Sequence, residues 1–348
     1  MTASVAKSRT TGIVGDKPWV LPPHKPFYLF NTKLIDPVEG KVIENAAVTV
    51  SGGRFTKVAT HDPSEEIDAG FTSVDLKGKY LCPGLIDGHV HVTVTPGEAD
   101  LKSTYKNIPA SMNNFRTTFL AREMVQRGFT TARDCGGADG SLKEAIDEWL
   151  IVGPRLLIAG HALSQTGGHG DQRASFSDED PTLKCCAKHR SGIGRLCDGP
   201  TECSVVVRDE IRKGADFIKI MGGGGVASRA MRHMIDNGVL GIEYGNFLDK
   251  DLAELMAAKG IYLTPTLVLP SLAILRSATI NCAQMLRRQD QIGQIKEGFL
   301  ADMIVLEKNP LEDIRVLDER ENLLAVVKEG RVAFSSVEEL PVTIGRAP

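Results

Sequence analysis

Two histidines, His89 and His91, stand two positions apart at the end of an apolar stretch with the pattern of a β-strand. Side chains two positions apart on a strand lie on the same face, so both imidazoles can bind one cation. The alternative is a surface pair, or a core pair with satisfied hydrogen bonds. Lys219 is another residue that could take part in chemistry, and it lies in a second strand-like segment. Its position alone also fits a lysine that forms a salt bridge at the end of a strand. His89 and His91 are therefore a candidate metal site on a strand.

The elements that would position these residues alternate between strand and helix. Their apolar periodicity predicts strands at 81–92, 130–134, 155–160 and 217–221, and helices at 115–127, 141–151 and 205–213. Such alternation is typical of a parallel sheet, which closes into a (β/α) barrel when it forms a ring.

Both chain ends carry a different pattern. Short alternating segments separated by turn residues occur at 27–58 and again at 301–334, and they predict strands of one shared sheet. We expect a loose arm at 1–25, a composite β-sandwich domain from 26–82 and 296–335, and a truncated barrel at 83–295.

Composition excludes some classes of function. The formal net charge is -3 over 348 residues, which gives no basic field for nucleic acid or for a membrane surface. The first 20 residues lack the apolar run of a signal peptide, so we expect a soluble cytoplasmic protein. Seven cysteines, an odd number, favour free thiols in a reducing compartment.

Three further features of the sequence could bind a metal or an anion, or serve as a ligand. A cluster of Cys185, Cys186, Cys197, Cys203 and His189 suggests a zinc knuckle, but no CxxC pair is present, so plain loop thiols are preferred. The glycines at 222–225 offer amides to an anion without a phosphate-binding motif, which favours a loop at the barrel rim. His161 matches no ligand position and is interpreted as structural.

The segment 82–91 reads Cys-Pro-Gly-Leu-Ile-Asp-Gly-His-Val-His and resembles the first barrel strand of the metal-dependent amidohydrolase superfamily. Within it, the chain is most similar to the imidazolonepropionase-like group, close to ochratoxinase-like and Xaa-Pro dipeptidase-like carboxypeptidases. Further matches follow in the family order, at 128–134, 153–155, 163–171, 214–221, 293–302 and 309–311.

The resemblance implies a metal site. In the family, the lysine that matches Lys219 is carboxylated and bridges two divalent metals, most often zinc, which His89 and His91 help to hold. A lysine buried near cations is shifted toward its neutral, nucleophilic form, which suits that modification. The resemblance also assigns a substrate-binding role to His169, for which the alternative is a polar loop residue.

The sequence departs from the family in its later strands. Tyr244 stands where the sixth strand carries a histidine ligand, and tyrosine, with a pKa near 10, is a poor zinc ligand at neutral pH. After Ser228 the fifth strand and its histidine are missing, and after Pro270 the eighth strand and its catalytic aspartate are missing. We therefore expect an incomplete (β/α)8 TIM-type barrel, an unknown catalytic base and at most one metal.

The primary hypothesis is a metal-dependent hydrolase, impaired by these losses, that cleaves carbon–nitrogen bonds of small-molecule amides with activated water. The first rival is an inactive truncated paralogue or isoform that serves as an oligomer partner. The second is a mononuclear enzyme that uses His89, His91, Lys219 and Tyr244. A homo-oligomer is compatible with each hypothesis.

Overall fold

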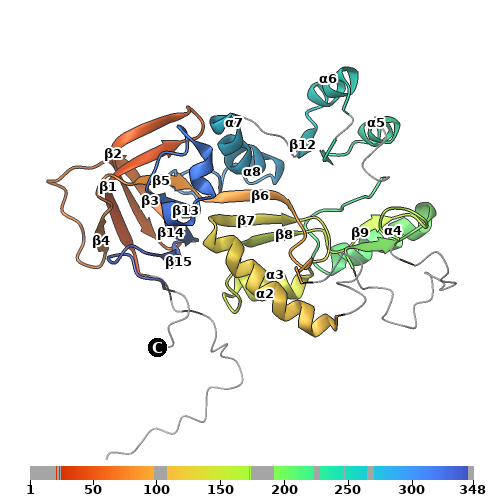
Figure 1. Cartoon of the computed structure of the whole chain (residues 1–348), viewed down its shortest axis with the longest axis horizontal. Helices are drawn as coiled ribbons and strands as arrows, with labels where there is room; N and C mark the ends of the chain where they lie inside the picture. The colour runs from red at the N-terminus through yellow and green to blue at the C-terminus, as the bar shows by residue number, and fades with distance from the viewer. Residues whose placement is uncertain are drawn as a thin grey trace, which may run out of the picture.

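The computed structural model of the chain describes residues 21, 23, 25–97, 108–171, 173, 192–222, 228–245, 248–264 and 270–343, with the backbone alone for 228 and 229. Figure 1 shows a sheet built from both chain ends on one side, parallel strands with helices in the middle, and separate smaller units beyond them. The predicted arm at 1–25 lies almost wholly outside the described residues.

The two chain ends meet in one eight-stranded sheet, as the sequence predicts. Its order is β15-β14-β13-β5-β1-β2-β3, and β4 pairs with β1 off this path. Antiparallel pairing of β13 with β5 joins the two ends. The strands are β1 (Phe27–Asp36), β2 (Lys41–Ser51), β3 (Arg54–Thr60), β4 (Thr72–Asp75), β5 (Tyr80–Pro83), β13 (Met303–Leu306), β14 (Leu323–Lys328) and β15 (Arg331–Ser335).

This sheet curls around its own core. Val50 and Phe55 from one edge pack in the same buried cluster as Val327 and Val332 from the other. Residues from opposite edges can share a core only if the sheet bends back on itself, because paired strands lie about 4.8 Å apart. The predicted sandwich is therefore one continuous folded sheet in the described residues, and the predicted domain boundaries stay a prediction.

Three parallel strands, β6 (Leu85–Val90), β7 (Phe129–Asp134) and β8 (Arg155–Ile158), begin the barrel region. Helices α2 (Ala110–Gln126) and α3 (Gly140–Asp147) cover them. Small apolar side chains of the helices and strands, such as those of α2 and β7, make one buried cluster. This is the βα alternation that the sequence predicts.

The remaining elements form smaller units. Parallel pairs join β9 with β10, and β11 with β12. The elements are β9 (Ala162–Ser164), β10 (Gly194–Leu196), α4 (Gly199–Arg212), α5 (Ser228–Asp236), β11 (Gly241–Glu243), α6 (Lys250–Ala258), β12 (Tyr262–Thr264), α7 (Ser271–Arg276), η2 (Ser277–Asn281), α8 (Cys282–Met285), η3 (Ile314–Leu317) and η4 (Arg320–Asn322).

No closed ring of strands forms within the described ranges. The strand predicted at 217–221 is present only as an isolated bridge from Ile220 to Leu163 of β9. A barrel strand is stabilised by hydrogen bonds on both edges, and here the strand expected on its second side has no counterpart in the described residues. Two backbone hydrogen bonds with Leu163 of β9 hold the segment, and they are too few to define a full strand.

The turn between the sheet and the barrel region requires glycine. A Cβ atom on Gly84 would lie 2.3 Å from Oγ1 of Thr130 in β7, closer than side-chain atoms pack. The Pro83-Gly84 dipeptide thus lets the chain pass tightly from β5 into β6, which carries His89.

In the described part of the chain, every helix is either too short or too polar to span a lipid bilayer.

Glu210 of α4 gives the fold a testable pH dependence. Burial opposes its ionisation, but hydrogen bonds from His161 and Arg195 outweigh burial and lower the pKa of Glu210 from 4.5 to about 2. Its stabilisation is therefore full above the unfolded-state pKa and is lost as pH falls toward 2. We expect Glu210→Gln to cost on the order of 3 kcal/mol at pH 7, and less as pH falls below about 5.

Urea denaturation of both proteins at several pH values between about 7 and 3 measures this difference. Curves that stay parallel across that range would rule out the pKa shift as the source of the stabilisation.

Candidate active site

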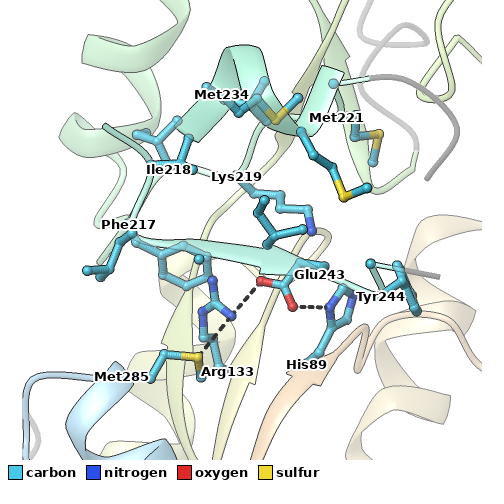
Figure 2. Close-up of a pocket in the computed structure, with 18 of the residues that line it drawn as sticks. His89, Arg133, Phe217, Ile218, Lys219, Met221, Met234, Glu243, Tyr244 and Met285 are labelled. Carbon is cyan, nitrogen blue, oxygen red and sulfur yellow. Dashed lines mark hydrogen bonds and ion pairs between the residues drawn. The ribbon is translucent and has the colours of Figure 1, made fainter. Parts of the chain in front are cut away.

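A cavity of about 940 Å³ lies beside β6, β7 and β11, with His89, Arg133 and Glu243 in its wall. It is lined by the predicted residues His89, His91, His169, Lys219 and Tyr244, together with many apolar side chains. Figure 2 shows that its labelled polar residues come from β6, β7, β11 and the segment around Lys219. The structure thus brings together all five site residues that the sequence singles out.

His89 and His91 hold their rings in an arrangement suited to a cation. Their Nε2 atoms lie 3.4 Å apart, close to the roughly 3.4 Å that separates two nitrogens bound to one tetrahedral zinc. Nδ1 of His91 donates to the carbonyl of Gly136 at 2.8 Å, and Nδ1 of His89 donates to Oε2 of Glu243 at 2.8 Å. With both Nδ1 atoms engaged as donors, both Nε2 lone pairs remain for a metal.

The charge state of His91 also suits a ligand. Burial lowers its pKa below the ordinary value, and the neighbouring His89 and Lys219 act in the same direction, so the ring is neutral at pH 7. A neutral imidazole is the form that binds metal.

Glu243 connects three strands at the site. Besides accepting from His89, its Oε1 accepts from Nη1 of Arg133 at 2.7 Å, and Arg133 also donates to the carbonyl of Gly88 at 3.1 Å. Burial raises the pKa of Glu243, but the hydrogen bond from His89 and the charges of Arg133 and Lys219 lower it to about 2. No local motif pointed to Glu243, whose role follows from its contacts with other strands.

Lys219 enters the cavity on the side of Glu243 and His89 (Figure 2). Its backbone carbonyl accepts a hydrogen bond from the amide of Leu163 at 2.8 Å, which fixes the segment against β9. Burial lowers the pKa of the Lys219 amine, and the charge of Glu243 opposes this only in part. A larger neutral fraction of the amine is what carboxylation requires.

Tyr244 lies beside the histidine pair in a left-handed conformation with φ 67°. Its hydroxyl is 3.4 Å from Nε2 of His89, and the two rings are 5.0 Å apart. Burial raises the pKa of the phenol above 10, so it stays protonated at pH 7 and is a weak ligand. That Tyr244 occupies a degenerate ligand position stays a prediction.

Two carboxylates line the cavity in the described part of the chain, Asp216 and Glu243. Asp216 accepts from Lys143 at 2.6 Å and from the amide of Ile158 at 2.8 Å. Glu243 is held by His89 and Arg133. Both carboxylates are engaged, so neither is placed as a ready base for water.

A second residue that the sequence pattern did not reveal is Cys135, directly after β7. A ring nitrogen of His89, Sγ of Cys135 and a carboxylate oxygen of Glu243 all lie within 4.8 Å of one another. A cysteine at a strand end, two positions after Arg133, was the available signal.

The minor sequence features fall elsewhere. Sγ of Cys197 and Sγ of Cys203 lie 3.1 Å apart, whereas Cys185, Cys186 and His189 lie outside the described residues. Of the glycines at 222–225, only Gly222 is described. His161 bonds to Glu210, which agrees with a structural role.

The sequence of this chain matches the model of the amidohydrolase family over residues 80–236 and 236–333. It is 27% identical to an ochratoxinase of Aspergillus niger over 410 aligned positions, covering 86% of this chain and 85% of the relative. That alignment has more positions than this chain has residues, so part of the relative faces gaps here. The family match also restarts at residue 236, between Lys219 and Glu243.

Solved structures agree with this relationship. A prolidase crystallised with N-methylphosphonate-L-proline is 29% identical, with a TM-score of 0.81 over 88% of this chain and 99% of that chain. The crystal structure of the A. niger ochratoxinase has a TM-score of 0.78 at 22% identity, over 94% of this chain and 100% of that chain. The family match covers well over half of the chain, and the mixed α/β fold is shared with these structures. The chain therefore belongs to the amidohydrolase family.

Proposed function

We propose that this chain is a metal-dependent hydrolase of small-molecule amide bonds, and that it turns over slowly. Support comes from its family and from its similarity to an ochratoxinase and a prolidase. The same relatives make a C-terminal amide the first substrate to test.

One observation carries the proposal. The Nε2 atoms of His89 and His91 lie 3.4 Å apart, and the Nδ1 atom of each ring is already engaged as a donor. A pair of imidazoles arranged this way at a cavity fits a divalent ion such as zinc better than it fits a structural role. The cavity supplies the space for a substrate beside the pair.

The residues have separate tasks in this proposal. His89, His91 and a carboxylated Lys219 would hold the cation, which supplies polarisation of the amide carbonyl and a lowered pKa of water. Carboxylation joins the neutral Lys219 amine to carbon dioxide through a new N–C bond, with one proton released to solvent. His169 would contact the substrate from its place in the cavity wall.

Slow turnover follows from the missing base. Asp216 and Glu243 are both held by other groups, and the phenol of Tyr244 stays protonated. A positioned base typically contributes about 100-fold or more to such a reaction. Metal binding should therefore survive the losses better than catalysis does.

The test is metal content together with amide hydrolysis and carbon labelling. We expect the purified chain to bind at most one equivalent of zinc, to give a carbamate signal after incubation with 13C-bicarbonate, and to hydrolyse N-acyl amino acids or Xaa-Pro dipeptides slowly. Lys219→Met should remove the carbamate signal and weaken zinc binding. Lys250→Met is the matched control, because Lys250 is 86% exposed on α6.

A folded chain that binds no zinc above the level of a nonspecific control would overturn the proposal. It would favour the rival hypothesis of an inactive oligomer partner. Two tightly bound metals with rapid turnover would overturn the expected impairment.

A further inference from the structure

Cys135 continues the strand face that enters the cavity. Its amide donates to the carbonyl of Val90 at 2.9 Å, so pairing with β6 extends one residue beyond β7. Side chains alternate along an extended strand, so Cys135 lies on the same face as Arg133. Arg133 lines the cavity and binds Glu243, which places the thiol on the side of the site.

The sulfur belongs to a compact group of donors. Sγ lies within 4.8 Å of a ring nitrogen of His89 and of a carboxylate oxygen of Glu243, and the Cys135 residue is fully buried. Its hydrogen bond to the carbonyl of Arg133 is long at 3.8 Å. This weak bond would be given up when the sulfur meets a cation.

We propose that Cys135 is a thiolate ligand of the cation in this site, in a mixed donor set with an imidazole nitrogen of His89 and a carboxylate oxygen of Glu243. The inference rests on the proposed function and names further ligands for it. On binding, the thiol loses its proton to solvent as the sulfur–metal bond forms.

The donor set makes chemical sense in this chain. The β11 end carries Tyr244, a weak ligand, where the related motif carries a histidine. Cys135 directly follows β7, whose pairing with β6 and β8 is intact. Donors around a tetrahedral zinc lie about 3.3–3.8 Å apart. The three ligand atoms lie within 4.8 Å of one another, so side-chain rotations that bring them about 1 Å closer would let them bind one ion.

Thiolate ligation also predicts which metal is selected. Sulfur ligands favour zinc and related soft ions over magnesium or manganese, which prefer oxygen. A site made only of imidazole, carbamate and water would discriminate less strongly against manganese.

Cys282 provides the matched control for a merely buried thiol. Both residues have a pKa of about 12, chiefly because of burial. Cys282 lies close to β6, since its sulfur would lie 3.1 Å from a Cβ on Gly88. Unlike Cys135, it does not belong to the donor group found among the described residues.

The experiment uses the full chain with Cys185, Cys186, Cys197 and Cys203 replaced by serine, so that these thiols cannot bind metal. Cobalt(II) is added to the metal-free protein, its stoichiometry is measured by elemental analysis, and the near-ultraviolet thiolate-to-cobalt absorption is recorded. We expect this absorption in the parent and in Cys282→Ser, and its loss in Cys135→Ser and Cys135→Ala. X-ray absorption of the zinc-loaded parent should show one sulfur at about 2.3 Å.

The outcomes separate the two proposals. Bound cobalt without the charge-transfer band, or a band unchanged in folded Cys135→Ala, overturns the thiolate ligand and leaves the metal-dependent hydrolase standing. Zinc that is bound without a sulfur neighbour in the parent also overturns the thiolate ligand. This measurement does not depend on the folding of any variant. A parent protein that binds no cobalt overturns both.

Discussion

Replacing Arg155 with methionine is expected to lower the free energy of unfolding by about 3–5 kcal/mol. Arg155 is 6% exposed at the start of β8 and donates to Asp302 at 2.7 Å, to Glu329 at 2.6 Å and to Thr131 at 2.8 Å. Without it, Asp302, which is 4% exposed, loses its ion pair with the guanidinium at 2.7 Å. The loss is large because burial removes the water that would otherwise solvate the carboxylate.

Urea denaturation at pH 7 measures this change. Arg315→Met is the matched control, since its ion pair with Asp313 is exposed to solvent and its loss should change the free energy of unfolding little. Adding Asp302→Asn to Arg155→Met should recover part of the loss, because it removes the stranded charge. Equal effects of the two arginine substitutions would show that the buried cluster does not stabilise the junction between β8 and the terminal sheet.

His91→Ala is expected to weaken zinc binding by more than about 100-fold, because loss of a partner that merely orients a ligand already costs 10–100-fold. The substitution removes one of the two Nε2 atoms that face each other at 3.4 Å. Competition with a chelating dye measures the zinc affinity, and amide hydrolysis should fall with it. His233→Ala is the control, because His233 is exposed on α5.

Tyr244→His tests the same site in the opposite direction. The new imidazole would stand near His89 and should tighten zinc binding, about tenfold for one partly strained ligand at φ 67°. Hydrolysis should rise little, because no base is restored. Zinc affinity unchanged by His91→Ala, or activity fully restored by Tyr244→His, would mean that the ligands have been assigned to the wrong residues.

Local patterns account for what the sequence predicted well. His89 and His91 are two positions apart, and a strand places such residues on one face whatever surrounds it. The strands at both chain ends were predicted by alternation and turn residues, and their pairing through β5 and β13 follows. By contrast, the strand expected around Lys219 is reduced to one bridge, because strand formation depends on a neighbour as well as on local propensity.

Glu243 and Cys135 could not be found in this way. Glu243 is 154 positions from His89, and its low pKa arises from a hydrogen bond and charges supplied by other strands. Cys135 is separated from His89 by the whole of α2 and β7, and its place at a strand end is a weak signal that does not reveal its neighbours.

By itself, the sequence determined the amidohydrolase relationship, the strands at both chain ends and the identity of the first two proposed ligands, because each depends on residues close together along the chain. The tertiary structure alone decided how the site is assembled: which ring nitrogens are engaged, which carboxylate is ionised beside Arg133, and which thiol lies near His89. Those properties depend on distance and burial, which arise only when separate strands pack around one cavity and exclude water.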